Sequence, residues 1–279
     1  MIDAALPRLL AALLCLGLLL LAERRWPFRA LPRGRWWPNL GLASLNAGLL
    51  ALLPALSALF AAHWAARHRL GLLHWLALPD WLALPLAFLA MDAAVYAQHR
   101  AMHHWPLLWR LHRVHHADPA LDVTSGLRFH PAEALVSALY KAAVTVLLGA
   151  PLAAVLAFVL ALNLGALFSH ANLRLSGKAE RRLRRLLVTP GMHRIHHSQR
   201  RQEQDRNFGF FSPWWDRLFG SYQAAPLGGE ATLRIGLDSG PERPAGLAEL
   251  LRQPLRPDPA PPASDTMLGQ CKTPPDSKP

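Results

Sequence analysis

The chain has 279 residues, of which 52% are hydrophobic, with a mean hydropathy of +0.15 and a formal net charge of +12. This combination argues against a single water-soluble core and favours long apolar spans joined by basic loops. A sequence pI near 11.0 also suits nucleic-acid binding, but the arginines stand beside apolar segments. Phospholipid headgroups are therefore the expected counter-charge, and no nucleic-acid partner is predicted.

Apolar segments predict an all-α membrane protein with three spans followed by a helical hairpin. The spans cover about residues 6–22, 40–62 and 72–96. Each is long enough to cross a hydrocarbon core of about 30 Å. Residues 134–168 form a further apolar region with Gly149-Ala150-Pro151 near its middle. This turn signal predicts two helices that are short for full spans.

The basic residues predict which side of the membrane each loop occupies. The loop after the first span holds five arginines, whereas the loop after the second holds only Arg67 and Arg69. The positive-inside rule therefore places the first loop in the cytoplasm. The third span then delivers residues 99–116 to the cytoplasm, and the hairpin, whether it spans or only dips, returns residues 170–197 to the same side. We expect a cytoplasmic, histidine-rich helical cap.

Histidines stand in three clusters whose spacing indicates a metal centre. One pair is four residues apart, and the pattern HxxHH then occurs twice. On a helix, positions i, i+3 and i+4 share a face, so each HxxHH cluster aims three imidazoles in one direction. Imidazole binds iron, zinc, copper and nickel. The predicted ligands are His99, His103, His112, His115, His116, His193, His196 and His197.

Asp92 is a candidate supporting residue because its spacing places it on the helical face of His99 and His103. It is expected either to accept the second N–H of a ligating histidine or to pair with an arginine such as Arg100. His104 lies off that face and is not a predicted ligand.

Three isolated residues complete the candidate site. His170 ends the last apolar helix, where it is either a ligand or an interfacial histidine. His130 precedes a proline that starts the next helix, so it is a ligand, a partner of a ligand or a helix-start residue. Asn172, two residues after His170, is a candidate catalytic residue. The remaining histidines at 63, 68 and 74 flank the loop on the opposite side and are predicted to have no metal role.

Several short motifs follow one another between about Asp92 and Tyr222. In chain order they read HRxxH, LWRLHRVHH, RFHPAE, SHANL, TPGMHRIHHS, NFG and WDRLFGSY. Their order resembles the bacterial branch of the fatty acid hydroxylase/sterol desaturase superfamily. The resemblance implies a bacterial inner-membrane protein that uses two non-haem irons and O₂. It implies hydroxylation or desaturation of a membrane-embedded acyl chain, sterol or related lipid.

The resemblance also assigns the ligands. The eight clustered histidines match the three motif boxes, and His170 matches the extra histidine before the last box. Some relatives have an HxxxH pair where this chain has alanine at position 166. A ligand is therefore missing, or it is supplied by His130 or by water.

Two other classes of metal protein remain as alternatives. A zinc metalloprotease uses HExxH, whereas both HxxHH clusters carry arginine after the first histidine. A metal transporter places its ligands near the middle of the membrane, whereas these clusters lie in polar, arginine-rich segments. No dinucleotide fingerprint, iron–sulfur motif or haem domain is visible. A separate electron-transfer protein is therefore expected, and the arginines at 181–185 would receive it or lie on anionic lipid.

The chain divides into three predicted regions. Residues 1–97 are N-terminal transmembrane helices, residues 98–224 are the catalytic region with its hairpin at 134–168, and residues 225–279 are a C-terminal extension. From about residue 257 the extension is dense in proline, aspartate and serine, and we predict that it is disordered.

Overall fold

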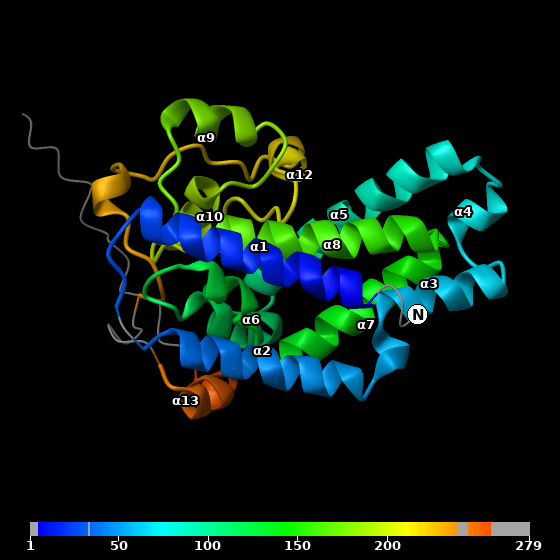
Figure 1. The fold of residues 1–279 in the computed structure, drawn as a ribbon, viewed down its shortest axis with the longest axis horizontal. Coiled ribbons are helices and arrows are strands. Elements are labelled where there is room, and N and C mark those ends of the chain that lie inside the picture. The colour runs from blue at the N-terminus through cyan, green and yellow to red at the C-terminus, as the bar shows by residue number, and fades with distance from the viewer. Residues whose placement is uncertain (1–4, 33, 239–244, 258–279) are drawn as a thin grey trace, which may run out of the picture.

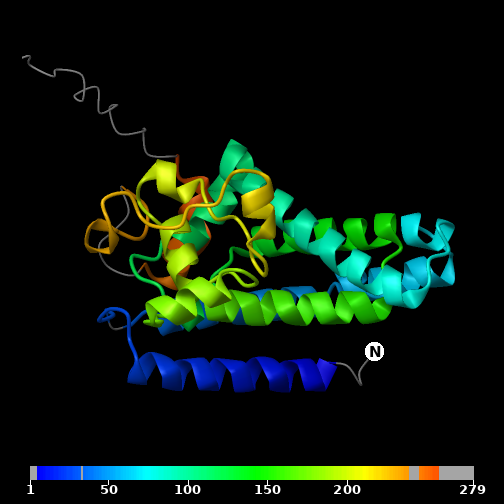
Figure 2. The same ribbon diagram turned by 90° about the horizontal axis from the view of Figure 1, so that it is seen from above.

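The computed structural model describes residues 5–32, 34–238 and 245–257. Within these ranges the regular secondary structure is helical, apart from two isolated β-bridges. Long helices extend roughly along the long axis of the molecule, and a cap of shorter helices and loops covers one end of them (Figures 1 and 2). The predicted all-α architecture with a histidine-rich cap is confirmed.

The first two helices run in opposite directions. α1 (Ala5–Arg25) runs toward the cap, and α2 (Trp36–Ala51) runs away from it (Figure 1). The prediction of one continuous span over residues 40–62 is wrong. Pro54 starts a short 3₁₀ turn, η2 (Pro54–Leu56), and a separate helix, α3 (Ala58–Arg67), follows it. Proline has no N–H and clashes with the preceding turn, so the apolar run cannot continue as one helix.

The third predicted span begins later than expected. Residue 72 starts only a single turn, α4 (Leu72–Trp75), and the long helix α5 (Asp80–His104) follows Pro79. Pro85 lies in the second turn of α5, where it removes one backbone hydrogen bond without ending the helix. α5 is long and apolar enough to cross a membrane and carries the first histidine pair at its cap end.

The helical hairpin is confirmed, and its arms are longer than expected. α7 (Pro131–Leu148) and α8 (Leu152–His170) are joined at Gly149, whose φ of 64° suits glycine. Together with α5, they are the three helices in the described ranges that are long and apolar enough to cross a membrane. A Cβ on Gly71 would overlap the backbone nitrogen of Gly149. The loop after α3 therefore packs directly on the hairpin turn.

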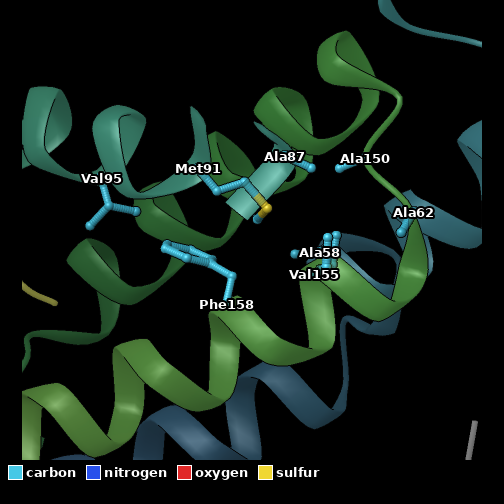
Figure 3. Packing of buried hydrophobic residues seen from close by; sticks show 9 residues of the cluster. Ala58, Ala62, Ala87, Met91, Val95, Ala150, Val155 and Phe158 are labelled. Atoms are coloured by element: carbon cyan, nitrogen blue, oxygen red, sulfur yellow. The ribbon is translucent and has the colours of Figure 1, made fainter. Parts of the chain in front are cut away.

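An apolar core joins α3, α5 and α8 (Figure 3). Its large side chains are Met91, Val155 and Phe158, and alanines from all three helices fill the spaces between them. The helix directions bring the C-terminal ends of α5 and α8 to the end of the molecule that carries the cap (Figure 1). The basic loop after α1 lies at this end too, as the predicted topology requires.

The cap is built from short helices and loops. Its helical elements are α6 (Pro106–His116), η3 (Val123–Leu127), α9 (Gly177–Leu183), α10 (Pro190–His196), α11 (Arg201–Gln204), α12 (Trp214–Leu218), η4 (Glu230–Thr232), α13 (Leu247–Arg252) and η5 (Gln253–Leu255). α13 packs on α2 and α6 through Leu250, which is fully buried with Leu42 and Val114. The predicted disorder of the tail concerns residues 258–279, which lie outside the described ranges.

Candidate metal centre

Three helices present the histidine clusters, and each has a local reason to form. α6 begins with Pro106 at its first position, where proline costs no hydrogen bond. α10 also begins with a proline, and the Thr189 hydroxyl accepts the backbone N–H of Met192. α5 supplies the third cluster from its last turns. A fourth contribution, His170, ends α8.

The structure brings nine histidines together in two adjacent groups. In each group the candidate ligand nitrogens all lie within 4.8 Å of one another. The first group is His99, His103, His112, His116 and His196, and the second is His115, His170, His193 and His197. None of these side chains is more than 1% exposed. All eight clustered histidines and His170 are therefore assembled at one buried place.

Each HxxHH cluster divides between the two groups. The pair separated by four residues, His112 and His116, belongs to the first group, whereas His115 belongs to the second. In α10 the assignment is reversed, because His193 and His197 join the second group and His196 joins the first. The His116 and His197 rings stack between the groups, with centroids 4.3 Å apart. The prediction that each HxxHH cluster aims three imidazoles in one direction did not include this division.

Backbone carbonyls orient four of the nine rings through one nitrogen. The Nδ1 atoms of four histidines lie 2.7 to 3.1 Å from carbonyl oxygens of neighbouring segments. The pairs are His99 with Phe208, His115 with Arg128, His170 with Ala166, and His196 with Arg206. A carbonyl only accepts, so Nδ1 carries the proton in each pair and Nε2 keeps a lone pair.

In two pairs, His99 with His112 and His115 with His170, the Nε2 atoms face one another without a proton to share. The Nε2 atoms of His115 and His170 are 3.0 Å apart, although the carbonyl contacts fix both as acceptors. Nε2 of His193 lies 3.0 Å from Nε2 of His170. Nε2 of His103 and both ring nitrogens of His116 have no hydrogen-bond partner among the residues that the structure describes, whereas Nδ1 of His103 lies 3.4 Å from an Asp205 carboxylate oxygen. Facing lone pairs repel unless a cation lies between them. Two sets of inward imidazole nitrogens therefore fit bound first-row transition-metal ions.

The electrostatics of the cap keep these histidines neutral. Burial lowers the pKa of His196 to about 3. Burial, together with the charges of neighbouring histidines, lowers the pKa values of His115, His116, His193 and His197 well below their usual range. Neutral imidazole is the form that binds metal, so the site is ready to ligate at neutral pH without first losing protons.

A carboxylate supports the first group, although the sequence did not single it out. Glu133 lies in the first turn of α7, and its Oε1 is 2.7 Å from Nδ1 of His112. Both side chains are buried. A carboxylate in this position fixes the ring and raises the basicity of the metal-facing nitrogen. The motif RFHPAE contains Glu133, but no local spacing relates it to His112, which lies 21 residues earlier.

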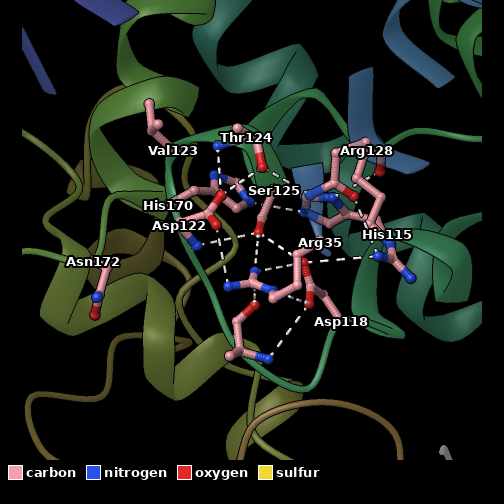
Figure 4. Close-up of polar contacts among 12 residues, drawn as sticks. Arg35, His115, Asp118, Asp122, Val123, Thr124, Ser125, Arg128, His170 and Asn172 are labelled. Carbon is pink, nitrogen blue, oxygen red and sulfur yellow. Dashed lines mark hydrogen bonds and ion pairs between the residues drawn. The ribbon is translucent and has the colours of Figure 1, made fainter. Parts of the chain in front are cut away.

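Behind the second group, a buried ionic network holds the loop between α6 and α7 (Figure 4). Arg35 donates two hydrogen bonds to the Asp118 carboxylate, at 3.1 and 2.8 Å, and lies 3.1 Å from Asp122. Arg128 donates to the Val114 carbonyl and also lies near Asp118. Because the Arg128 carbonyl faces His115, the network positions the acceptor that orients this imidazole ring.

The arginine inside each HRxHH cluster points away from the histidine groups. Arg113 donates to the carbonyls of Gln253 and Arg256 in the C-terminal segment. Arg194 lies over the ring of Phe28, 3.7 Å from its centroid. The two arginines therefore attach α6 and α10 to the rest of the cap.

Three other candidate residues lie outside both histidine groups. Asp92 accepts hydrogen bonds from the Ser212 hydroxyl and the Trp215 indole, not from a histidine or an arginine. Asn172 exchanges hydrogen bonds with the backbone of Arg29, which ties the end of α8 to the loop after α1. His130 is the N-cap residue of α7 and accepts the N–H of Ala132.

Ala166 occupies the position where some relatives have a second histidine, one turn before His170 on α8. His170 belongs to the second histidine group, which is the smaller of the two. The Ala166 carbonyl accepts from His170, and a Cβ on Gly126 would lie 2.9 Å from that carbonyl oxygen. The loop backbone therefore approaches α8 closely at this turn. The second group has four histidines, and His130 does not join it.

Fold and site together define a helical membrane protein with a histidine-box metal centre. Residues 84–221 match the fatty acid hydroxylase family. The chain belongs to the fatty acid hydroxylase/sterol desaturase superfamily, which confirms the resemblance predicted from its motifs.

Curated relatives of the chain act on lipids, according to their names. The ornithine lipid hydroxylase OlsE of Rhizobium tropici is 32% identical over 151 residues, which are 50% of this chain and 42% of that protein. Alkylglycerol monooxygenase of Danio rerio is 29% identical over 65% of this chain and 40% of its own length. The Homo sapiens enzyme is 27% identical over 71% and 44%, respectively. The match spans less than half the length of each relative, and no solved structure matches the chain.

Proposed function

We propose that this protein is an O₂-dependent, di-iron hydroxylase that acts on the alkyl part of a membrane lipid. The observation that carries the proposal is the pair of buried histidine groups, within which the Nε2 atoms of His115 and His170 face one another as acceptors. The family match and the names of the relatives support hydroxylation in preference to desaturation. They also favour an oxidoreductase over a zinc hydrolase or a metal transporter.

The five-histidine group and the four-histidine group would each hold one iron. When bound, the irons would supply the electrons and the oxidising power that O₂ chemistry at an unreactive C–H bond requires and that no side chain provides. The residues of this chain keep the ligands neutral by burial, and backbone carbonyls together with Glu133 fix their orientation. Burial also keeps bulk water away from the two histidine groups, where the reaction would take place.

The membrane position fits a lipid substrate. The ligands lie at the cap ends of α5 and α8, two helices long and apolar enough to cross a bilayer. An alkyl chain can therefore reach the site from the membrane without crossing water. The arginine-rich loop after α1 lies at the same end, which supports a cap on the cytoplasmic side of a bacterial inner membrane.

Electrons must come from another protein, because the chain carries no cofactor-binding fingerprint of its own for electron transfer. The exposed arginines at 181, 182 and 185, on and just after α9, offer a basic surface for an acidic electron donor.

The test compares whole-lipid mass spectra of cells with and without the gene, under air and under nitrogen. We expect one lipid class to gain one oxygen only in cells that carry the gene and are grown in air. His115→Ala should abolish this gain. A loss of two hydrogens would instead identify a desaturase, and an unchanged lipid profile from cells containing iron-loaded protein and an electron donor would refute the proposal.

A further inference from the structure

An apolar cleft lies on the membrane part of the protein, between α5 and α8. It has a volume of about 450 Å³. Leu84, Phe88 and Leu89 line it from α5, Ala153 and Ala157 from α8, and Phe211 from the segment before α12. This volume lies within the range of roughly 300–1,000 Å³ that is usual for small-molecule sites.

The few polar groups of the cleft are already satisfied. Asp92 and Ser212 stand at its cap end, and the serine hydroxyl donates to the Asp92 carboxylate at 2.6 Å. The Trp215 indole donates to the same carboxylate oxygen at 2.8 Å. A polar ligand would have to break these contacts, whereas a hydrocarbon only has to cover apolar surface.

The location of the cleft decides which hydrocarbon can enter. α5 and α8 both have the length and composition of membrane spans, so the cleft opens where lipid alkyl chains are the solvent. At its cap end stands Trp214, which is 43% exposed and donates its indole N–H to the Arg185 carbonyl. Tryptophan beside arginine is typical of the headgroup level.

An aromatic segment connects the cleft with the metal centre. Phe211 contacts Phe88 edge to face at 5.4 Å, and the neighbouring Phe210 ring lies 4.7 Å from the His99 ring. Asp92 is seven residues before His99, which corresponds to about 10 Å along α5. Asp216 holds the segment in place by accepting the N–H groups of residues 208 and 209, each at 2.8 Å.

We propose that this cleft is the binding site for the alkyl chain of the lipid substrate, with the headgroup beside Trp214 and the chain between α5 and α8. The inference rests on the proposed function in treating the bound lipid as a substrate, but alkyl binding itself can be measured without turnover. Phe210 and Phe211 form the wall between the bound chain and the first histidine group, so their size helps to determine which carbon approaches the metal centre.

Two exposed alanines provide variants that fill the cleft without disturbing the core. Ala153 and Ala157 lie one turn apart on α8, where they are exposed and line the cleft. Ala157→Trp should occupy the cleft, whereas Ala143→Trp places the same side chain on an exposed position of α7, outside the cleft. The purified full chain in detergent is photolysed with palmitic acid that carries a diazirine in its chain, and labelled peptides are identified by mass spectrometry with and without excess palmitic acid.

We expect saturable labelling of peptides that contain residues 84–92 and 153–157. Ala157→Trp should weaken it by about tenfold, as a well-placed steric block does, whereas Ala143→Trp should match the natural chain. Uniform labelling that palmitic acid does not compete away, or unchanged labelling of Ala157→Trp, would overturn the proposal. Saturable labelling of a protein that modifies no lipid would leave the alkyl site standing and refute the proposed enzymatic function instead.

Discussion

Replacing Glu133 with glutamine should weaken iron binding while leaving the fold intact. The Glu133 carboxylate accepts from His112 at 2.7 Å, and the two side chains are 2% and 0% exposed. Its other oxygen, Oε2, has no hydrogen-bond partner within the described part of the chain, so the His112 contact is its main interaction there. Glutamine keeps the shape and one acceptor, but removes the charge that makes His112 a stronger ligand.

Two independent magnitudes agree on the size of the effect. Removing a partner that orients a metal ligand typically lowers metal affinity about 10- to 100-fold, which corresponds to about 1.4–2.8 kcal/mol. A hydrogen bond to a charged group contributes roughly 1.5–3 kcal/mol. We therefore expect Glu133→Gln to release its iron at chelator concentrations about 10- to 100-fold lower than the natural chain.

The assay dialyses iron-loaded protein against graded chelator and measures the iron that remains by mass spectrometry. Asp92→Asn is the matched control, because it also neutralises a buried carboxylate but one that contacts Ser212 and Trp215 in place of a histidine. The reasoning is refuted if Glu133→Gln holds iron as tightly as the natural chain, or if Asp92→Asn loses iron equally.

Three further outcomes are expected. His115→Ala and His196→Ala should each lower the bound iron and abolish lipid modification. His68 is exposed and caps α3, at the end of the molecule opposite the histidine groups, so His68→Ala should change neither. Equal damage from His68→Ala would contradict the ligand set. Leu250→Ala should lower the stability of the protein in detergent by roughly 2–5 kcal/mol, because the side chain is fully buried between α13, α2 and α6, and a smaller loss would mean that this segment packs loosely. Arg35→Leu should cost about 3–5 kcal/mol in the same denaturation experiment, because it removes the ion pair of buried Asp122 and one of the two arginines beside buried Asp118. Unchanged stability would show that water replaces the arginine.

The sequence was most informative where function requires a regular spacing. Histidines at i, i+3 and i+4 share a helical face, so the grouping within each cluster could be predicted from spacing. That the separate clusters lie on one side of the membrane could be predicted from the order of the spans. The count of membrane crossings added His170, because that residue ends a helix that must return to the same side. The hairpin turn could be predicted at Gly149 for a similarly local reason, since glycine and proline mark the break.

Other features depend on contacts between distant parts of the chain. Glu133 meets His112 across 21 residues, and Arg35 meets Asp118 across 83, so no local pattern connects them. The break in the second predicted span has a local cause, because Pro54 starts the 3₁₀ turn that interrupts it. The residues on both sides of Pro54 are apolar, so the run was predicted as one span. Asp92 was placed on the correct face of α5, yet its partners come from residues 212 and 215, which spacing alone does not reveal.

The HxxHH clusters of α6 and α10 are both divided between the two histidine groups. On each helix, the i and i+4 histidines face one group and the i+3 histidine faces the other. α6 therefore gives two histidines to the first group and one to the second, whereas the α10 cluster gives one to the first and two to the second. This arrangement makes both groups depend on the same two short helices. Neither helix has more than 11 residues, and an isolated helix of that length is marginal in water. Tertiary contacts must therefore hold them: Arg113 and Arg194 attach their outer faces, while carbonyl contacts orient several of the inner rings. In such a scaffold the facing lone pairs destabilise the protein without metal. Bound metal removes that repulsion, so metal binding should stabilise the cap as a unit and not one helix at a time.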